Sequence, residues 1–280
     1  MRESLLSYVK TLSIVTVQSA LLFIAMLLAF LPFAHAPGVL GITGGYLAYS
    51  LYPVLLYLLL IVAHRGFNRL SVADLRCSWW RLLAGIVAGV AIGAIAVLAS
   101  VALIAFWLPE VSLELSGQSG SPQEWVILLA NVWQTAFSEE FLFRGFLLFT
   151  LLHRGIRQHS AVMWSTLIFT CVHFAVKPPW WLFSTAAAGA LLGYLYVTSA
   201  NIGAPVGCHL AINLVFGLIN RGILLQLNGA ENHLLAVMIS QCVVYLVIAQ
   251  FVMLFHRPQV RAGGMLELHS GTLLPDEAQI

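Results

Sequence analysis

Eight long runs of apolar residues limit what this chain can fold into. Each run is close to the ~20 residues that an α-helix needs to cross a ~30 Å hydrocarbon core at 1.5 Å per residue. The composition agrees, because 60% of the 280 residues are hydrophobic and only 9% are charged, whereas soluble domains have roughly 25% charged residues. A soluble fold is therefore excluded. The runs cover residues 12–33, 38–63, 82–107, 125–152, 160–176, 180–197, 205–219 and 233–255.

These runs predict an all-α, polytopic transmembrane bundle of about eight helices. A backbone in contact with lipid must satisfy its own hydrogen bonds, and the runs lack the alternating pattern of a membrane β-barrel strand. We expect residues 1–257 to form one membrane helical domain. Residues 258–280 are more polar and include Gly263 and Gly264, which predicts a flexible cytoplasmic tail.

The basic residues indicate the orientation of the bundle. They are concentrated before the first run and in the loops at alternate ends of the later runs, whereas the opposite loops contain only Lys177 and Arg221. Basic loops face the cytoplasm, so we expect both termini to be cytoplasmic. The basic loops contain Arg2, Lys10, Arg65, Arg69, Arg76, Arg81, Arg154, Arg157, Arg257 and Arg261.

Small residues and a proline mark expected packing features. Gly85, Gly89 and Gly93 recur every fourth residue in the third run, a spacing that lets two helix backbones approach closely. Pro53 lies inside the second run and predicts a kink there.

Two acids lie where a membrane helix should have none. Glu139 and Glu140 are near the middle of the fourth run, and an ionised side chain at the centre of such a helix costs roughly 2.5 to 3.5 kcal/mol. Arg144 follows Glu140 by four residues, on the same helix face and in the favoured order for an ion pair. Glu139 has no such partner, so it is the acid available to a reacting water. The other interpretation is a buried ion-pair network that holds helices together.

Three further polar residues lie in later runs. His173 follows Phe169 by one helical turn, and His209 and Asn213 share a helix face. A single histidine in a helix usually makes a structural hydrogen bond. Together with the acids, however, these residues supply a base, two imidazoles and an amide donor for an oxyanion. That set is typical of a hydrolase.

Other classes of intramembrane hydrolase lack their residues here. The only aspartates are Asp74 and Asp276, outside the runs, so a two-aspartate protease is excluded. The chain has no H-E-x-x-H zinc motif and no G-x-S-x-G serine motif. Glutamate and histidine remain.

The ordered set Glu139-Glu140-x-x-x-Arg144, Phe169-x-x-x-His173 and His209-x-x-x-Asn213 resembles the CAAX prenyl protease type II and bacteriocin-processing family, also called CPBP or Abi. The sequences around Gly145 and Pro205 are also similar to that family, and the resemblance covers residues 124–220 as the expected catalytic core.

The resemblance implies an intramembrane endopeptidase of the glutamate or metallo type. In it Glu139 activates water, His173 and His209 position water or stabilise the transition state, and Asn213 supports the oxyanion, while Glu140 and Arg144 orient the site. Family members have been described both with and without a metal. Glu139, His173 and His209 could hold zinc.

The expected partners are the lipid bilayer and a membrane-associated or lipidated peptide or protein, with no nucleic acid. The short loops resemble those of bacterial relatives, which predicts an integral protein of the bacterial inner membrane. Two alternatives stay open. One is a non-proteolytic scaffold or regulatory partner of another membrane protein. The other is a transporter or proton relay, although no inverted repeat is evident.

The expected site poses a problem of depth. If every run crosses the whole membrane, Glu139, His173 and His209 lie at three different levels, and a spread beyond about 10 Å would count heavily against hydrolysis. We therefore expect a short fifth helix, a recessed loop at residues 177–179 and a seventh helix that starts deep in the membrane near Pro205.

Overall fold

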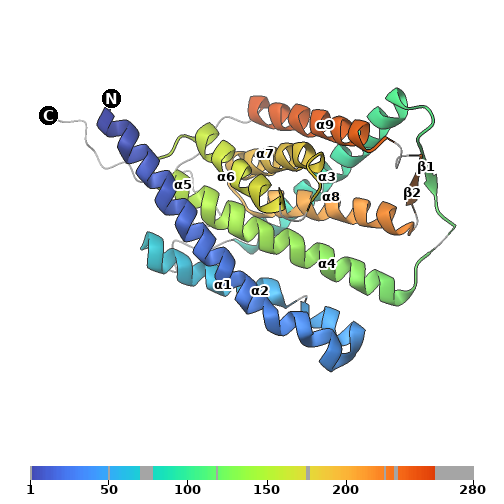
Figure 1. Cartoon of the computed structure of the whole chain (residues 1–280), viewed down its shortest axis with the longest axis horizontal. Coiled ribbons are helices and arrows are strands. Elements are labelled where there is room, and N and C mark those ends of the chain that lie inside the picture. Colours follow the sequence, from blue (N-terminus) through green and yellow to red (C-terminus); the bar gives the residue numbers. More distant parts are fainter. Residues whose placement is uncertain are drawn as a thin grey trace.

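The computed structural model describes residues 2–49, 51–69, 78–117, 119–174, 177–223, 225–229 and 233–255 (Figure 1). The predicted all-α bundle is confirmed. The expected tail at residues 258–280 lies outside the described residues. Within the described part, four helical segments are long and apolar enough to cross a membrane, namely Leu6–Phe30, Trp79–Trp107, Trp181–Ser199 and Leu234–Leu254.

The last six predicted runs match helical segments within three residues at each end. The fourth is continuous from α4 through the π-helix η3 into α5, and the others each form one α-helix. The elements are α3 (Trp79–Trp107), α4 (Pro122–Glu140), η3 (Phe141–Leu148), α5 (Phe149–His153), α6 (Gln158–Phe174), α7 (Trp181–Ser199), α8 (Gly203–Arg221) and α9 (Leu234–Phe255).

The division of the N-terminal region was predicted wrongly. Helical structure runs without a gap through α1 (Arg2–Tyr49), followed by α2 (Tyr52–Ala63) and the π-helix η1 (His64–Asn68). Pro53 stands in the first turn of α2 rather than at a kink, because proline lacks the N–H that a first turn leaves unpaired.

Helix α1 nevertheless reverses direction. The rings of Phe30 and Tyr49 are 5.4 Å apart, whereas nineteen residues of straight helix would separate them by about 28 Å. The hydroxyl of Tyr52 donates to the carbonyl oxygen of Met26, 2.6 Å away. The fold-back therefore places the start of α2 against the middle of α1.

The glycine row of α3 forms a close contact with α8. A Cβ at Gly89 would overlap the backbone of Ala204, and one at Gly93 would overlap Cys208. On α8, Gly203 and Gly207 lie in turn against the backbone of α3. The predicted close approach is confirmed, and it fixes α8 parallel to α3.

We expect Gly89→Val to destabilise the protein by about 1–3 kcal/mol, because the added atoms would force α3 away from α8. Thermal unfolding of the purified protein in detergent would measure the loss. Gly66→Ala is the matched control, since no atom lies within 4 Å of a Cβ at that position. Equal stability of the two variants would contradict the close contact.

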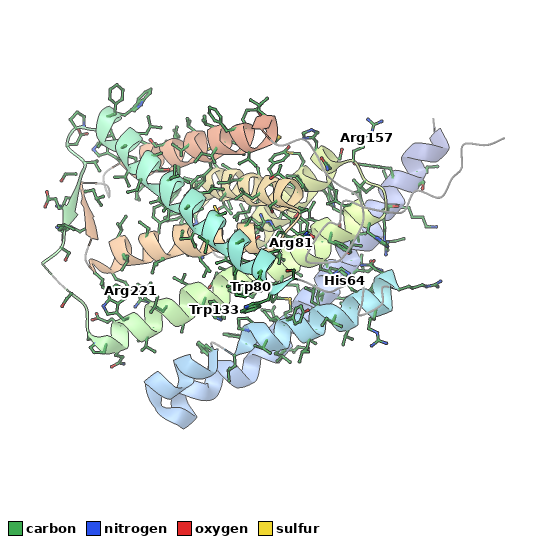
Figure 2. The ribbon with its side chains drawn as sticks, turned by 180° about the vertical axis from the view of Figure 1, so that it is seen from behind. His64, Trp80, Arg81, Trp133, Arg157 and Arg221 are labelled. Carbon is green, nitrogen blue, oxygen red and sulfur yellow. The ribbon has the colours of Figure 1, made fainter. Side chains whose placement is uncertain are left out.

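A short antiparallel ribbon covers one end of the bundle. Strand β1 (Ser112–Leu115), between α3 and α4, pairs with β2 (Leu225–Asn228), between α8 and α9, with Ser112 opposite Asn228. Figure 2 shows Arg221 near this end and Arg157 toward the other. The ribbon thus joins two loops that the sequence places on the same side of the membrane.

Candidate active site

The two acids stand at the junction of two helix types. Glu139 and Glu140 end α4, and the backbone continues as the π-helix η3, all eight residues of which are buried. Single π-helical turns within α-helices are frequent at functional sites. Ser165 donates to the carbonyl oxygen of Phe143, and the Nε2 of His64 donates to that of Gly145. These contacts satisfy part of the buried backbone of η3.

Glu140 and Arg144 form the predicted ion pair. Nη1 of Arg144 lies 2.9 Å from Oε1 of Glu140, and both side chains are fully buried. Nη2 of Arg144 donates to the carbonyl oxygen of Gly189 at 2.8 Å, and the guanidinium stands over the ring of Phe169. Arg144 therefore joins α4, α6 and α7 around one buried charge.

Each of the two histidines is held by a hydrogen bond from its own Nδ1 atom. Nδ1 of His173 lies 2.8 Å from the carbonyl oxygen of Phe169. Nδ1 of His209 lies 2.8 Å from Oε1 of Glu140. A carbonyl and an ionised carboxylate can only accept, so each Nδ1 is the donor, and in the neutral imidazole each Nε2 is left as an acceptor.

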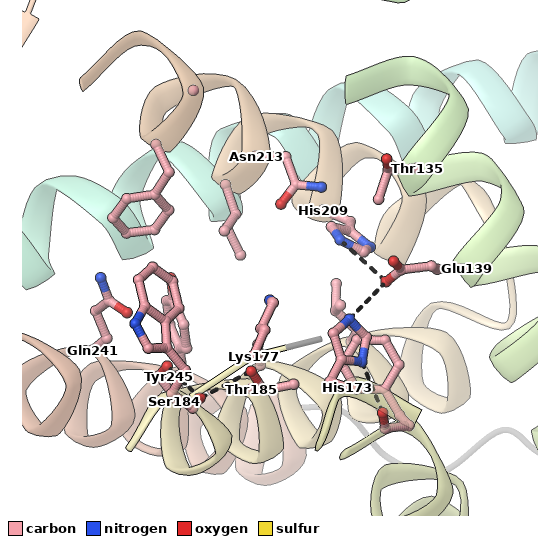
Figure 3. A pocket seen from close by; sticks show the side chains of 17 residues that line it. Thr135, Glu139, His173, Lys177, Ser184, Thr185, His209, Asn213, Gln241 and Tyr245 are labelled. Carbon is pink, nitrogen blue, oxygen red and sulfur yellow. Dashed lines mark hydrogen bonds and ion pairs between the residues drawn. The ribbon is translucent and has the colours of Figure 1, made fainter. Parts of the chain in front are cut away.

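Both Nε2 atoms face Glu139. Oε2 of Glu139 is 3.7 Å from Nε2 of His173 and 3.8 Å from Nε2 of His209 (Figure 3). These distances are too long for direct hydrogen bonds, and Oε2 has no hydrogen-bond partner among the described residues. A water molecule has two hydrogens, so it can bridge Oε2 of Glu139 to Nε2 of one histidine at a time.

Helix lengths explain why the three groups meet. Glu139 lies about 21 Å along its helical segment from His153, and His173 lies about 22 Å along α6 from Gln158. The two segments are antiparallel and share the turn between α5 and α6, so Glu139 and His173 stand at the same height above that turn. His209 is only about 9 Å from the start of α8 at Gly203. Helix α8 therefore begins higher in the bundle than the turn between α5 and α6. It corresponds to the seventh predicted run, which we expected to start deep in the membrane.

Asn213 faces the same space. A cavity of about 410 Å³ is lined by Glu139, His173, His209 and Asn213 together with Lys177. The lining position of Lys177 agrees with a recessed loop between α6 and α7. The structure thus brings four predicted site residues to one cavity and places Glu140 and Arg144 directly behind them.

Sequence reasoning missed several groups that line the cavity, including Gln241 and Tyr245 on α9 and Thr135 on α4. Gln241 and Tyr245 are four residues apart and almost fully buried. The signal was available, because Gln241 is a polar residue inside an apolar run, as Glu139 is.

The zinc expectation finds no support in the donor geometry. Among the described residues, no three His, Cys, Asp or Glu side chains form a group that could hold a metal ion.

Comparison with known proteins agrees with the geometry. A family model described as type II CAAX prenyl endopeptidase, Rce1-like, matches residues 121–215. Residues 121–215 are thus similar to that family. This segment contains all six predicted site residues, so the resemblance inferred from the motifs is confirmed.

The Rce1-like segment also has a bacterial relative. The uncharacterized protein YpbD of Bacillus subtilis (strain 168) is 29% identical over 154 residues, which cover 52% of this chain and 70% of YpbD. No solved structure matches the chain significantly. The Rce1-like match and the long apolar helices together support a membrane-embedded protease.

Proposed function

We propose that this protein is an intramembrane endopeptidase in which Glu139 activates the hydrolytic water. The observation that carries the proposal is the unpartnered Oε2 of Glu139, which faces Nε2 of both His173 and His209 in one cavity. An ion-pair network would have given Glu139 a cationic partner, as Glu140 has in Arg144.

The proposed reaction is a general-base hydrolysis. Glu139 takes a proton from water as the oxygen attacks the scissile carbonyl carbon, and the amide of Asn213 donates to the oxyanion that forms. Collapse of this intermediate breaks the C–N bond, and the proton held by Glu139 passes to the leaving nitrogen. Nε2 of either His173 or His209 accepts the second hydrogen of this water and orients it. Glu140 fixes His209 by accepting from its Nδ1.

A second cavity favours a substrate that is lipidated or inserted in the membrane. It has a volume of about 580 Å³ and touches Glu139 and His173 from the side of α1 and α2. Its walls include Phe23, Leu27 and Val172. An apolar side chain or lipid chain held there would lie directly beside the reacting bond.

We expect Val172→Trp to block this second cavity and to raise the KM for a membrane peptide about tenfold or more. Leu167→Trp is the matched control on the same helix, because Leu167 is 49% exposed and lines neither cavity. Steady-state cleavage by both variants in nanodiscs would measure the effect. An unchanged KM for Val172→Trp would contradict substrate binding at this side.

Labelled water tests hydrolysis directly. The purified protein in proteoliposomes would be incubated in ¹⁸O water with a library of apolar and lipidated peptides, and the fragments analysed by mass spectrometry. We expect one ¹⁸O atom in the new carboxyl terminus of the N-terminal fragment and none in the fragment that leaves as the amine. Absence of cleavage across the library, with the protein folded, would favour the scaffold alternative.

The proposed setting is the bacterial inner membrane with both termini in the cytoplasm. Arg157 and Arg221 mark opposite ends of the bundle (Figure 2), and the ribbon of β1 and β2 lies at the end that carries fewer basic residues in the sequence. This arrangement supports placing the ribbon on the side of the membrane opposite the cytoplasm.

A further inference from the structure

One buried histidine outside the Rce1-like segment contacts the helix that carries the two acids. His64 belongs to η1, whereas the family match begins at residue 121. Its side chain is fully buried, and its Nε2 lies 2.9 Å from the carbonyl oxygen of Gly145. Gly145 is in η3, directly after Arg144. The N-terminal region therefore makes a polar contact with the backbone of the site.

The hydrogen bond from His64 replaces one that an α-helix would make internally. In an α-helix the carbonyl of Gly145 would accept from the N–H of Phe149, four residues later. The N–H of Phe149 donates instead to the carbonyl oxygens of Arg144 and Phe146. Because a buried carbonyl needs a donor, the imidazole of His64 takes the place that the N–H of Phe149 has left.

This donor is fixed on both sides of the junction between η3 and α5. The carbonyl of Gly145 can only accept, so Nε2 of His64 carries the hydrogen and Nδ1 of the neutral ring is an acceptor. The amide of Asn68 donates to that Nδ1 at 2.8 Å and to the hydroxyl of Thr150, in α5, at 2.9 Å. The ring of His64 also packs against two rings of the same segment, those of Phe146 and Phe149.

The register of η3 determines where the two acids point. Glu139 and Glu140 end α4 and directly precede η3. An α-helix turns about 100° per residue, so a register shift of one residue would rotate both acids by about that angle relative to α5. Oε2 of Glu139 faces Nε2 of His173 and of His209 at 3.7 and 3.8 Å. A rotation of that size would turn the carboxylate away from both histidines.

We propose that His64 is a positioning residue that holds η3 in its π-helical register and thereby directs Glu139 toward His173 and His209. Without this donor, the N–H of Phe149 would return to the carbonyl of Gly145, and the segment would relax toward an α-helix. The effect on rate rests on the proposed function, whereas the register can be measured without cleavage. The N-terminal helices would then be part of the catalytic unit and more than a membrane anchor.

Two substitutions of His64 test the effect on rate. His64→Leu removes the donor, whereas His64→Gln keeps an amide that can donate to Gly145 and accept from Asn68. Steady-state cleavage of a membrane peptide in nanodiscs would be measured per mole of folded protein. We expect His64→Leu to lower kcat about 10²-fold, as misplaced catalytic groups do, with KM unchanged. His64→Gln should recover most of kcat. His159→Leu is the matched control, because it removes another partly buried histidine, which bonds to Tyr194.

A spectroscopic measurement tests the register itself. Trp133 lies on α4, is 40% exposed and packs against the ring of Phe137. A rotation of α4 would change the surroundings of this indole. The full chain would be labelled with 5-fluorotryptophan, and the ¹⁹F resonance of Trp133 assigned with Trp133→Phe. We expect His64→Leu to shift that resonance and His64→Gln to return it. The resonance of Trp107, exposed at the end of α3, should stay in place.

Each outcome supports or overturns the proposal. A lower kcat together with a shifted Trp133 resonance, both recovered by His64→Gln, supports it. An unmoved Trp133 resonance in His64→Leu overturns it, and so does an unchanged kcat in a variant whose resonance has moved. If His64→Leu does not fold, Asn68→Ala decides, since it frees the imidazole without removing it; smaller changes in the same direction support the proposal and none overturns it. A parent protein that cleaves nothing would refute the proposed function, while the ¹⁹F spectra would still decide the register.

Discussion

Glu139→Ala is expected to lower cleavage of a membrane peptide by about 10²- to 10⁴-fold, the usual contribution of a general base. The variant should express and unfold like the parent protein, because Glu139 makes no direct hydrogen bond through Oε2. Cleavage assays in nanodiscs and thermal unfolding would measure the two effects.

Glu114→Gln is the matched control for Glu139→Ala. It removes an exposed acid from strand β1, away from the site, and should leave the rate unchanged. Retained cleavage by Glu139→Ala would refute the assignment of the base. Full biological complementation by a variant with Glu139, His173 and His209 all replaced would instead favour the scaffold.

Arg144→Met is expected to cost roughly 3–5 kcal/mol of stability, because it leaves the carboxylate of Glu140 buried without its cation. The double variant Glu140→Met with Arg144→Met should recover much of that loss, since no unpaired charge remains. Thermal unfolding of the parent and the single and double variants would show this order.

Activity should not follow stability in this series. The double variant still lacks the acceptor that holds Nδ1 of His209, so its cleavage rate should stay low. A double variant no more stable than Arg144→Met would contradict the view that an uncompensated charge causes the loss. A fully active double variant would show that Glu140 does not orient His209.

Local sequence spacing was sufficient for contacts within one helix. The pair of Glu140 with Arg144 and the bond of His173 to Phe169 each span four residues, so the helical repeat alone predicts them. The close approach at the glycine row of α3 was likewise predicted, although the glycines that pack against it from α8, Gly203 and Gly207, were not recognised.

Contacts between helices required information that periodicity does not contain. The meeting of Glu139 with both histidines depends on how far α8 is displaced relative to α6. The π-helical hydrogen bonding of η3 leaves no mark in the apolar pattern, because all eight of its residues are buried. The reversal within α1 was missed for a related reason, since helical dihedrals continue to Tyr49 while the chain changes direction.

The two cavities that share Glu139 and His173 have a consequence for the conformation of the substrate. An α-helix with its side chains is about 10–12 Å wide, and its backbone carbonyls are hydrogen-bonded within the helix. A peptide whose scissile bond lies beside Glu139 must therefore be extended at that point, so that the carbonyl is open to the attacking water. A transmembrane substrate has to unwind locally first, so the stability of its own helix would help decide which proteins are cut.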